Sequence, residues 1–282
     1  MIRVENLKKN YGNKEVLKGL DFFIETGEIF SLLGPNGAGK TTTIKILTGQ
    51  LDPDAGSVQI MEKDVFSHRK FLCPRLGFMP EETNLYERLS VRENLKFFCR
   101  LYGVDFNRIE KYLSFVGMAA EADTPVKKLS RGMKQKVLLI RSLLHEPEVL
   151  FLDEPVSGLD PASAASIHRL LERLNNKGLT ILLTSHDMEE VDRLSDRIAF
   201  LDEGEIAALD HPTSLKLNHS PGKLEVLLKV EGKIEKRTLE INSEKAADKI
   251  AGWMKEGRLG AVHSSEPTLA EIFVDITGSE LK

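Results

Sequence analysis

The 282-residue sequence contains no long hydrophobic run; its longest apolar stretches, such as VLLI at 137–140, have the length of buried core segments. A membrane-spanning helix needs about 20 consecutive, mostly apolar residues, so we expect no such helix. The first residues, MIRVENLKKNYG, have the pattern of a strand and lack the apolar stretch of a signal peptide. These absences predict a soluble, intracellular chain.

Cysteine is scarce and a net positive charge is absent. The two cysteines, Cys73 and Cys99, lie in apolar contexts without metal-binding spacing, so we expect two buried free thiols. Domains that bind nucleic acid over their whole surface are strongly basic, whereas this chain has a net charge of −4. We therefore expect no nucleic-acid partner, and a chain long enough for one large α/β domain and a smaller one.

Strand and helix patterns alternate through most of the chain. Two strand patterns precede IFSLLG (29–34), whose apolar residues are typical of a strand buried on both faces. Helical patterns occupy about 82–145, including a capping box at Ser90–Glu93, and strands and helices then alternate again to about 210. This predicts an α/β fold with a mixed, mostly parallel sheet, an antiparallel β subdomain and a helical insertion.

The end of the chain has a different organisation. Two prolines and little periodicity near 211–222 indicate a linker, which we place at 213–222. Residues 223–282 alternate strand and helix patterns without visible chemistry, and predict a small α+β domain in which Trp253 packs. The expected division is thus a first domain at 1–212, with its helical subdomain at about 82–145, then the linker and the small domain.

The stretch GPNGAGKTT at 34–42 fits the complete phosphate-loop pattern and lies between a strand and a helix. Its glycines allow successive N–H groups to point at a phosphate, the ammonium of Lys40 neutralises phosphate charge, and the hydroxyl of Thr41 suits Mg²⁺. A chance glycine turn is the alternative, which the flanking strand and helix disfavour. The predicted nucleotide-binding residues are Gly34, Pro35, Asn36, Gly37, Ala38, Gly39, Lys40, Thr41 and Thr42.

Three further candidates follow apolar strands. VLFLDEP at 149–155 ends in two carboxylates: Asp153 is placed to hold magnesium, and Glu154 to activate water as a general base. His186 follows the strand LTILLTS, at the edge of a parallel sheet where ligands bind. We expect His186 to donate to a γ-phosphate, a purely structural histidine being the alternative.

A second phosphate-binding feature is predicted at LSRGMKQK, residues 129–136. A helix is expected to begin there, with the hydroxyl of Ser130 and the backbone N–H of Gly132 at its N-terminus. Helix N-termini bind anions. A chain that binds its nucleotide on a complete phosphate loop has no evident need for a second phosphate-binding site.

Together these motifs resemble the ATP-binding cassette family, the motor subunits of ABC transporters. The phosphate loop, LSRGMKQK, VLFLDEP, SGLD at 157–160 and TSH at 184–186 occur in the order typical of that family, over residues 1 to about 210. The NKxD motif of GTPases is absent from the sequence. The resemblance implies a P-loop NTPase cassette that binds ATP with Mg²⁺ and hydrolyses it, using Glu154, His186 and Lys40 as catalytic residues.

The resemblance also accounts for the second phosphate-binding feature. In this family two cassettes pair head to tail, and the signature helix of one covers the ATP on the phosphate loop of the other. Ser130 and Gly132 would therefore bind the γ-phosphate of the ATP held by a second copy, and Asp160 would lie at the same interface.

The resemblance assigns two more positions and reveals two departures. Tyr11 aligns with the aromatic residue that stacks on adenine, packing between strands being the alternative. Glu81 stands where the family has a glutamine that contacts Mg²⁺, so the expected metal ligands are Thr41, Glu81 and Asp153. Arg131 stands where the signature usually has glycine, but neither departure removes a residue of the expected chemistry.

The segments FMPEETNLYERLSVRENL and TLAEIFVDITG look most like the exporter branch, in which cassette and permease are separate chains. We expect the ATPase subunit of an exporter, peripheral on the cytoplasmic face of the cell membrane, with a second copy and a transmembrane permease as partners. The alternatives are an importer ATPase of the same fold, a soluble cassette protein that acts on ribosomes or DNA, and a regulatory binding module that hydrolyses little.

Overall fold

The computed structural model describes residues 1–82, 84–230, 233–241 and 243–278, which divide into two compact units. The first unit contains Met1–His211 and the second Pro212–Gly278. No helix within these described ranges is long and apolar enough to cross a membrane.

The strands are β1 Ile2–Tyr11, β2 Lys14–Ile24, β3 Ile29–Leu33, β4 Ala55–Ile60, β5 Lys63–Asp64, β6 Leu76–Met79, β7 Val149–Asp153, β8 Thr180–Ser185, β9 Arg197–Asp202, β10 Glu205–Asp210, β11 Lys223–Val230, β12 Lys233–Glu240 and β13 Leu259–Ser264. The helices are α1 Lys40–Leu47, α2 Arg69–Leu72, α3 Val91–Tyr102, α4 Asn107–Phe115, α5 Arg131–Leu143, α6 Pro161–Asn175, α7 Met188–Leu194, α8 Pro212–Asn218, α9 Glu244–Lys255 and α10 Leu269–Thr277.

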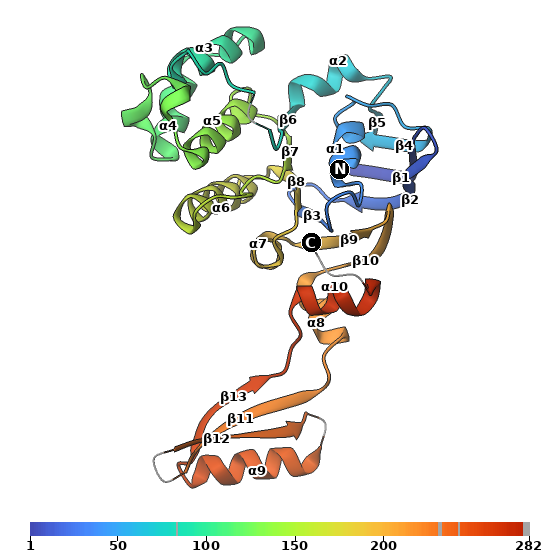
Figure 1. The fold of residues 1–282 in the computed structure, drawn as a ribbon, viewed down its shortest axis with the longest axis vertical. Coiled ribbons are helices and arrows are strands. Elements are labelled where there is room, and N and C mark those ends of the chain that lie inside the picture. The colour runs from blue at the N-terminus through green and yellow to red at the C-terminus, as the bar shows by residue number, and fades with distance from the viewer. Residues whose placement is uncertain (83, 231–232, 242, 279–282) are drawn as a thin grey trace. The chain divides into compact units, whose positions relative to one another are not determined.

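Two sheets form the first unit (Figure 1). One is antiparallel with strand order β2-β1-β4-β5, and the other has the order β10-β9-β3-β8-β7-β6, in which only β10 runs antiparallel to its neighbour. Strands β3, β7 and β8 are buried along their whole length, as their continuous apolar sequences require. The predicted mixed, mostly parallel sheet and antiparallel subdomain are thus confirmed.

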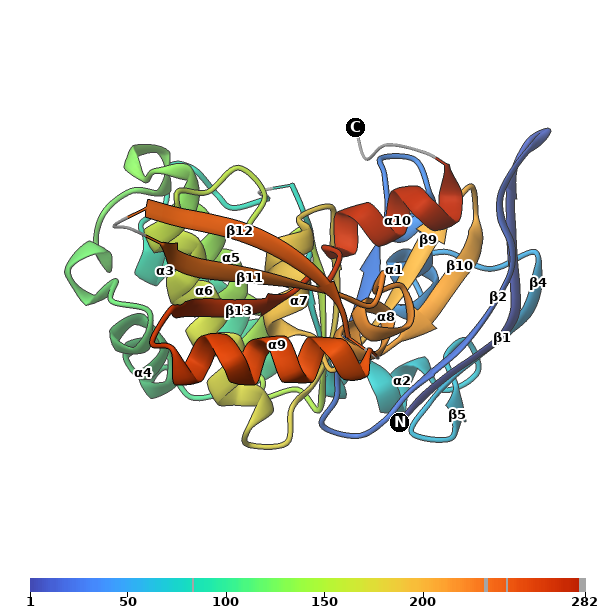
Figure 2. The same ribbon diagram turned by 90° about the horizontal axis from the view of Figure 1, so that it is seen from below.

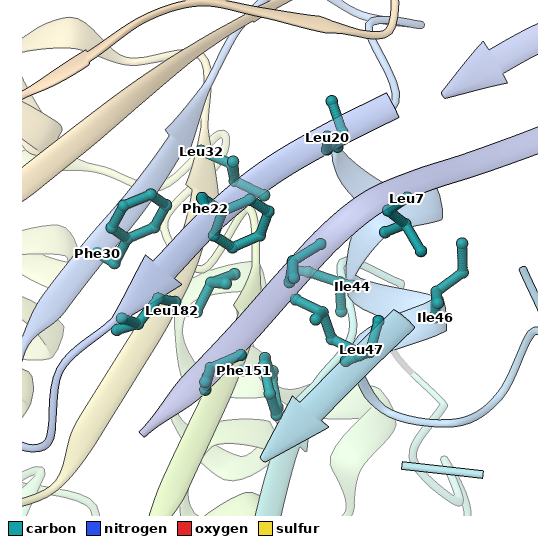
Figure 3. Close-up of a cluster of buried hydrophobic side chains, with 14 of the residues drawn as sticks. Leu7, Leu20, Phe22, Phe30, Leu32, Ile44, Ile46, Leu47, Phe151 and Leu182 are labelled. Atoms are coloured by element: carbon teal, nitrogen blue, oxygen red, sulfur yellow. The ribbon is translucent and has the colours of Figure 1, made fainter. Parts of the chain in front are cut away.

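An apolar core joins the two sheets around α1 (Figure 3). The rings of Phe22 from β2 and Phe30 from β3 stack with centroids 5.4 Å apart, and Ile44 and Leu47 of α1 are fully buried in the same cluster. Burying each of these side chains contributes about 1.5–3 kcal/mol. The core therefore fixes α1, and with it the helix N-terminus to which the phosphate loop leads.

Helices α3, α4 and α5 fill the predicted helical subdomain. The Oγ of Ser90 accepts a hydrogen bond from the N–H of Glu93, whose carboxylate accepts one from the N–H of Ser90 in return, so the predicted capping box is confirmed. These hydrogen bonds from Ser90 lower the pKa of the Glu93 carboxyl. The helix ends at Gly103 in the left-handed conformation, as its sequence predicts.

The prediction of two buried thiols is wrong for Cys73. Cys99 is buried on α3, which raises the pKa of its thiol, but Cys73 is exposed. It begins a short 3₁₀ turn, Cys73–Arg75, directly after α2, where Leu72 is the buried residue. Apolar neighbours in sequence do not say which side of a turn faces the core.

The second unit combines the antiparallel sheet β12-β11-β13 with three helices (Figure 2). Its buried side chains come from β11 (Val226 and Leu228) and from the helices, above all Phe273 of α10. Trp253 is half-buried on α9. The stretch expected as a linker, 213–222, contains all of α8 except its first residue, Pro212, a position where proline suits a helix.

Candidate active site

The phosphate loop joins β3 to the N-terminus of α1. Gly39 precedes this helix with φ of 113°, a conformation that favours a residue without a side chain. Within the described part of the chain, no side chain caps the first turn of α1 and no acidic residue lies in it. The N–H groups of this turn are therefore available to an anion.

A cavity of about 230 Å³ lies over the loop and brings together most of the predicted nucleotide site. It is lined by Pro35, Asn36, Gly37, Gly39, Lys40, Thr41, Thr42, Tyr11, Lys14, Val16, Glu81 and Glu154. Two predicted loop residues lie outside this lining: Ala38 is buried, and Gly34 packs against the carbonyl oxygen of Leu201, which leaves no room for a Cβ.

Of the five lining residues outside the phosphate loop, three belong to the antiparallel sheet. Tyr11 is 51% exposed, so its ring is not packed between strands and can stack on a base. Lys14 and Val16 were not predicted, because a strand pattern does not show which of its residues face a ligand on another sheet.

Lys40, Glu154 and His186 form one chain of contacts. The Nζ of Lys40 donates to the carbonyl of Gly34 at 2.6 Å and lies 3.3 Å from Oε1 of Glu154. The other carboxylate oxygen of Glu154 lies 2.8 Å from Nδ1 of His186. An unpaired buried ammonium or carboxylate would cost several kcal/mol, so these contacts are what allow Lys40 and Glu154 to be buried.

Asp153, the last residue of β7, lies beside the start of α1. Its Oδ1 accepts hydrogen bonds from the hydroxyls of Thr184, at 2.6 Å, and Thr41, at 3.3 Å. Mg²⁺ is usually held by one or two carboxylates together with substrate phosphates and water. The hydroxyl of Thr41 and the carboxylate of Asp153 fit that donor set; Thr41 and Glu81 line the cavity, whereas Asp153 is buried beside Thr41 and does not line it.

The backbone of Glu154 is left-handed, with φ of 49°, which is strained for a residue with a side chain. Its N–H donates to the carbonyl and to the hydroxyl of Thr184, at 3.2 and 3.1 Å. Thr184 therefore holds the carboxylate of Asp153 and the backbone of Glu154. We did not predict this contact, although Thr184 belongs to the TSH motif.

Helix α5 begins at the second phosphate-binding feature. Ser130 is its N-cap, and the Ser130 Oγ accepts from the N–H of Met133 at 3.3 Å. Gly132 packs against α6, since a Cβ there would lie 2.8 Å from the Oγ of Ser163. Asp160 caps α6, and its hydrogen bonds with Ser163 hold the pKa of the Asp160 carboxyl below its usual range.

The start of α5 and the phosphate loop line different cavities. Leu129, Arg131, Lys134 and Gln135 line a cavity of about 540 Å³, together with Glu81 and Glu82. Glu81 is the lining residue that this cavity shares with the cavity over the phosphate loop. Ser130 and Gly132 themselves line neither cavity, so the second phosphate-binding feature does not contribute to the cavity over the phosphate loop of its own chain.

Arg131, the departure within LSRGMKQK, lies against the SGLD segment of the same chain. A Cβ on Gly158, whose φ is 67°, would approach the Nη1 of Arg131 to 2.5 Å. The guanidinium therefore occupies the space beside Gly158 and connects the start of α5 to the loop before α6.

Known proteins of similar sequence and structure fall into one family. The model of the ABC transporter family matches residues 17–157. The whole chain is 39% identical to the fluoroquinolones export ATP-binding protein of Mycobacterium tuberculosis, of which the match covers 94%. It is 41% identical to Nod factor export ATP-binding protein I of Ralstonia nicotianae, over 79% of this chain and 70% of that protein.

Solved structures show the same likeness. An ATP-binding subunit of an ABC transporter superposes with a TM-score of 0.70 at 28% identity, over 77% of this chain and 92% of the other. A dimeric ATP-binding cassette in a post-hydrolysis state, bound to ADP and Pi, superposes with a TM-score of 0.69 at 25% identity, over 75% and 98%.

Proposed function

The chain belongs to the ABC transporter family as the ATP-binding subunit of an exporter, and from this premise we propose that two copies pair head to tail around two Mg-ATP. As an ABC ATPase it hydrolyses ATP for transport. The predicted exporter branch is confirmed, because the similar curated proteins are export ATP-binding proteins. This disfavours the importer and the cassette proteins that act on ribosomes or DNA.

The observation that supports the head-to-tail pairing is that Ser130 and Gly132 do not line the cavity over the phosphate loop of their own chain. The α5 N-terminus, with Ser130 and Gly132, binds the γ-phosphate of an ATP held by the phosphate loop of the partner copy. Asp160 lies at the same interface, beside Gly132. Neither copy has a complete site by itself.

Residues 34–42, with Lys40 as the cation, bind the phosphates, and Tyr11 stacks on the adenine. In this structure the ammonium of Lys40 pairs with Glu154. When ATP binds, the ammonium pairs with the β- and γ-phosphates instead. The arrival of phosphate thereby releases one carboxylate oxygen of Glu154. Thr41, Asp153 and Glu81 hold Mg²⁺, which neutralises the phosphate charge when bound.

Hydrolysis depends on Glu154 and His186. Glu154 accepts the proton of the attacking water, a general-base role that contributes about 10²–10⁴-fold to a rate. His186, in contact with that carboxylate, donates to the γ-phosphate. Closure of the dimer excludes water from the reacting phosphate.

The remaining partner is a transmembrane permease on a separate chain. Through the permease the ATPase subunit lies on the cytoplasmic face of the cell membrane. The permease selects the cargo, since the nucleotide site described here has no role in binding it.

Two experiments test this function. Glu154→Gln should bind Mg-ATP, hydrolyse it at least about 100-fold more slowly, and elute as a dimer from a sizing column. The double variant Lys40→Ala/Glu154→Gln should remain monomeric. If Glu154→Gln stayed monomeric with Mg-ATP, alone and with the permease, the head-to-tail dimer would be refuted.

The second experiment tests the permease. The tagged chain, extracted from membranes in mild detergent, should co-purify with a polytopic membrane protein in stoichiometric amount. Co-purification of soluble partners only would refute the permease as partner.

A further inference from the structure

A buried polar cluster that no catalytic role explains lies between α6 and α7. Glu190 of α7 is 4% exposed, and His168 of α6 and Ser185 of β8 are also buried. A buried carboxylate is costly unless both of its oxygens are paired. Here Oε1 lies 3.2 Å from the Nε2 of His168, and Oε2 accepts from the Ser185 hydroxyl at 2.6 Å.

This cluster leads to the backbone on both sides of His186. The Oγ of Ser185 accepts from the N–H of Asp187 at 3.0 Å, so one hydroxyl is tied to Glu190 and to the residue after His186. The Asp187 carboxylate in turn accepts from the N–H of Glu190 at 3.1 Å, as the N-cap of α7. Glu190 is therefore connected to the 185–187 turn through two routes.

The turn matters because packing does not fix the His186 side chain. That side chain is 50% exposed, whereas the side chain of Glu154, which it contacts, is 7% exposed. A cavity of about 440 Å³ lies beside them and is lined by Glu154, His186 and Glu190 among others, so the imidazole has room to turn away. Its position depends on the backbone that carries it.

We propose that Glu190 and His168 are positioning residues for ATP hydrolysis: they hold the 185–187 turn so that His186 lies against Glu154 and reaches the γ-phosphate. This inference rests on the proposed function. Neither residue touches the nucleotide, so ATP binding through the phosphate loop does not need them. A small displacement of a catalytic group is enough to cost about 100-fold in rate.

The test compares Glu190→Ala with Glu189→Ala, a matched control at the exposed neighbouring position. Glu190→Ala should lower the single-turnover hydrolysis rate about tenfold or more and leave the Kd for ATP unchanged, while Glu189→Ala should match the parent. In a His186→Ala background, Glu190→Ala should cause no further loss. The same fold-loss in both backgrounds, or a full rate in Glu190→Ala, would overturn the inference.

Three further variants keep the test decisive if Glu190→Ala does not fold. Ser185→Ala removes one hydroxyl and should slow hydrolysis in the same way. His168→Gln, which retains an N–H donor, should keep more activity than His168→Leu; parental rates in Ser185→Ala and His168→Leu would overturn the inference. If parental hydrolysis survived Glu154→Gln, the proposed function itself would fail, and this inference with it.

Discussion

The two units of the chain differ in whether they bury ionisable side chains. In Met1–His211 the interior holds ionisable groups, among them Lys40, Asp153, Glu154 and Glu190. In the described residues of Pro212–Gly278, every buried side chain is apolar. Burial of charge costs stability, so the first unit carries a cost that its chemistry requires, while the described buried positions of the second unit carry no such cost.

The largest effect that tests this contrast is on stability. Phe273→Ala should destabilise the second unit by about 3–5 kcal/mol, because it leaves a cavity at a fully buried position, and should not change basal ATP hydrolysis. Thermal unfolding with tryptophan fluorescence, which reports Trp253 of this unit, measures the first effect. Val274→Ala, at an exposed neighbour, is the matched control. Loss of hydrolysis in folded Phe273→Ala would show that the second unit takes part in catalysis.

The next effect is on binding. Lys40→Ala should weaken ATP binding by about 1.5–3 kcal/mol, or about ten- to hundredfold in Kd, because a charge-assisted contact to phosphate is lost. Titration calorimetry measures it, with Lys45→Ala at an exposed position of the same helix as control. An unchanged Kd would show that the phosphate loop does not bind the nucleotide.

A smaller effect should be the same in both units, which share one helix-capping motif. Ser90 caps α3 and Thr268 caps α10, each in a capping box with the glutamate three residues later. Ser90→Ala and Thr268→Ala should each cost about 1 kcal/mol of unfolding free energy in their own unit. Denaturant unfolding measures both, and a markedly unequal cost would mean that one cap has a further role.

The smallest effect is a pH dependence of the same motif. Hydrogen bonds from Ser90 and Thr268 lower the pKa of Glu93 and Glu271. A folded-state pKa below the unfolded value stabilises the fold above the unfolded pKa, and this contribution is lost as pH falls through the folded pKa. The deficit of Glu93→Gln and Glu271→Gln against the parent should therefore be present at pH 7 and disappear in acid. A deficit independent of pH would contradict it.

Local chemistry was enough to predict most of the fold. The capping box at Ser90, the glycine stop at Gly103 and the strand–loop–helix at 29–47 each depend on neighbouring residues, and the structure has them all. Helix α8 was missed because the two prolines near 211–222 were taken as a linker, although Pro212 begins the helix. For Cys73, the apolar neighbourhood did not reveal the exposed side of the turn.

Contacts across the sheet could not be predicted from the sequence. Thr184 aligns Asp153 from a neighbouring strand, and His168 pairs with Glu190 between two helices. Such pairs depend on strand order and helix packing, which no local pattern contains. The candidate residues were therefore predicted one by one, and their arrangement came from the structure.

The left-handed backbone of Glu154 has an evolutionary consequence. A side chain in this conformation costs about 1–2 kcal/mol, and glycine would avoid that cost. A lineage that no longer needed hydrolysis would relieve this strain by losing Glu154, but it would also leave the buried ammonium of Lys40 without its carboxylate, which is costly. In related chains that have lost hydrolysis, we therefore expect positions 154 and 40 to change together.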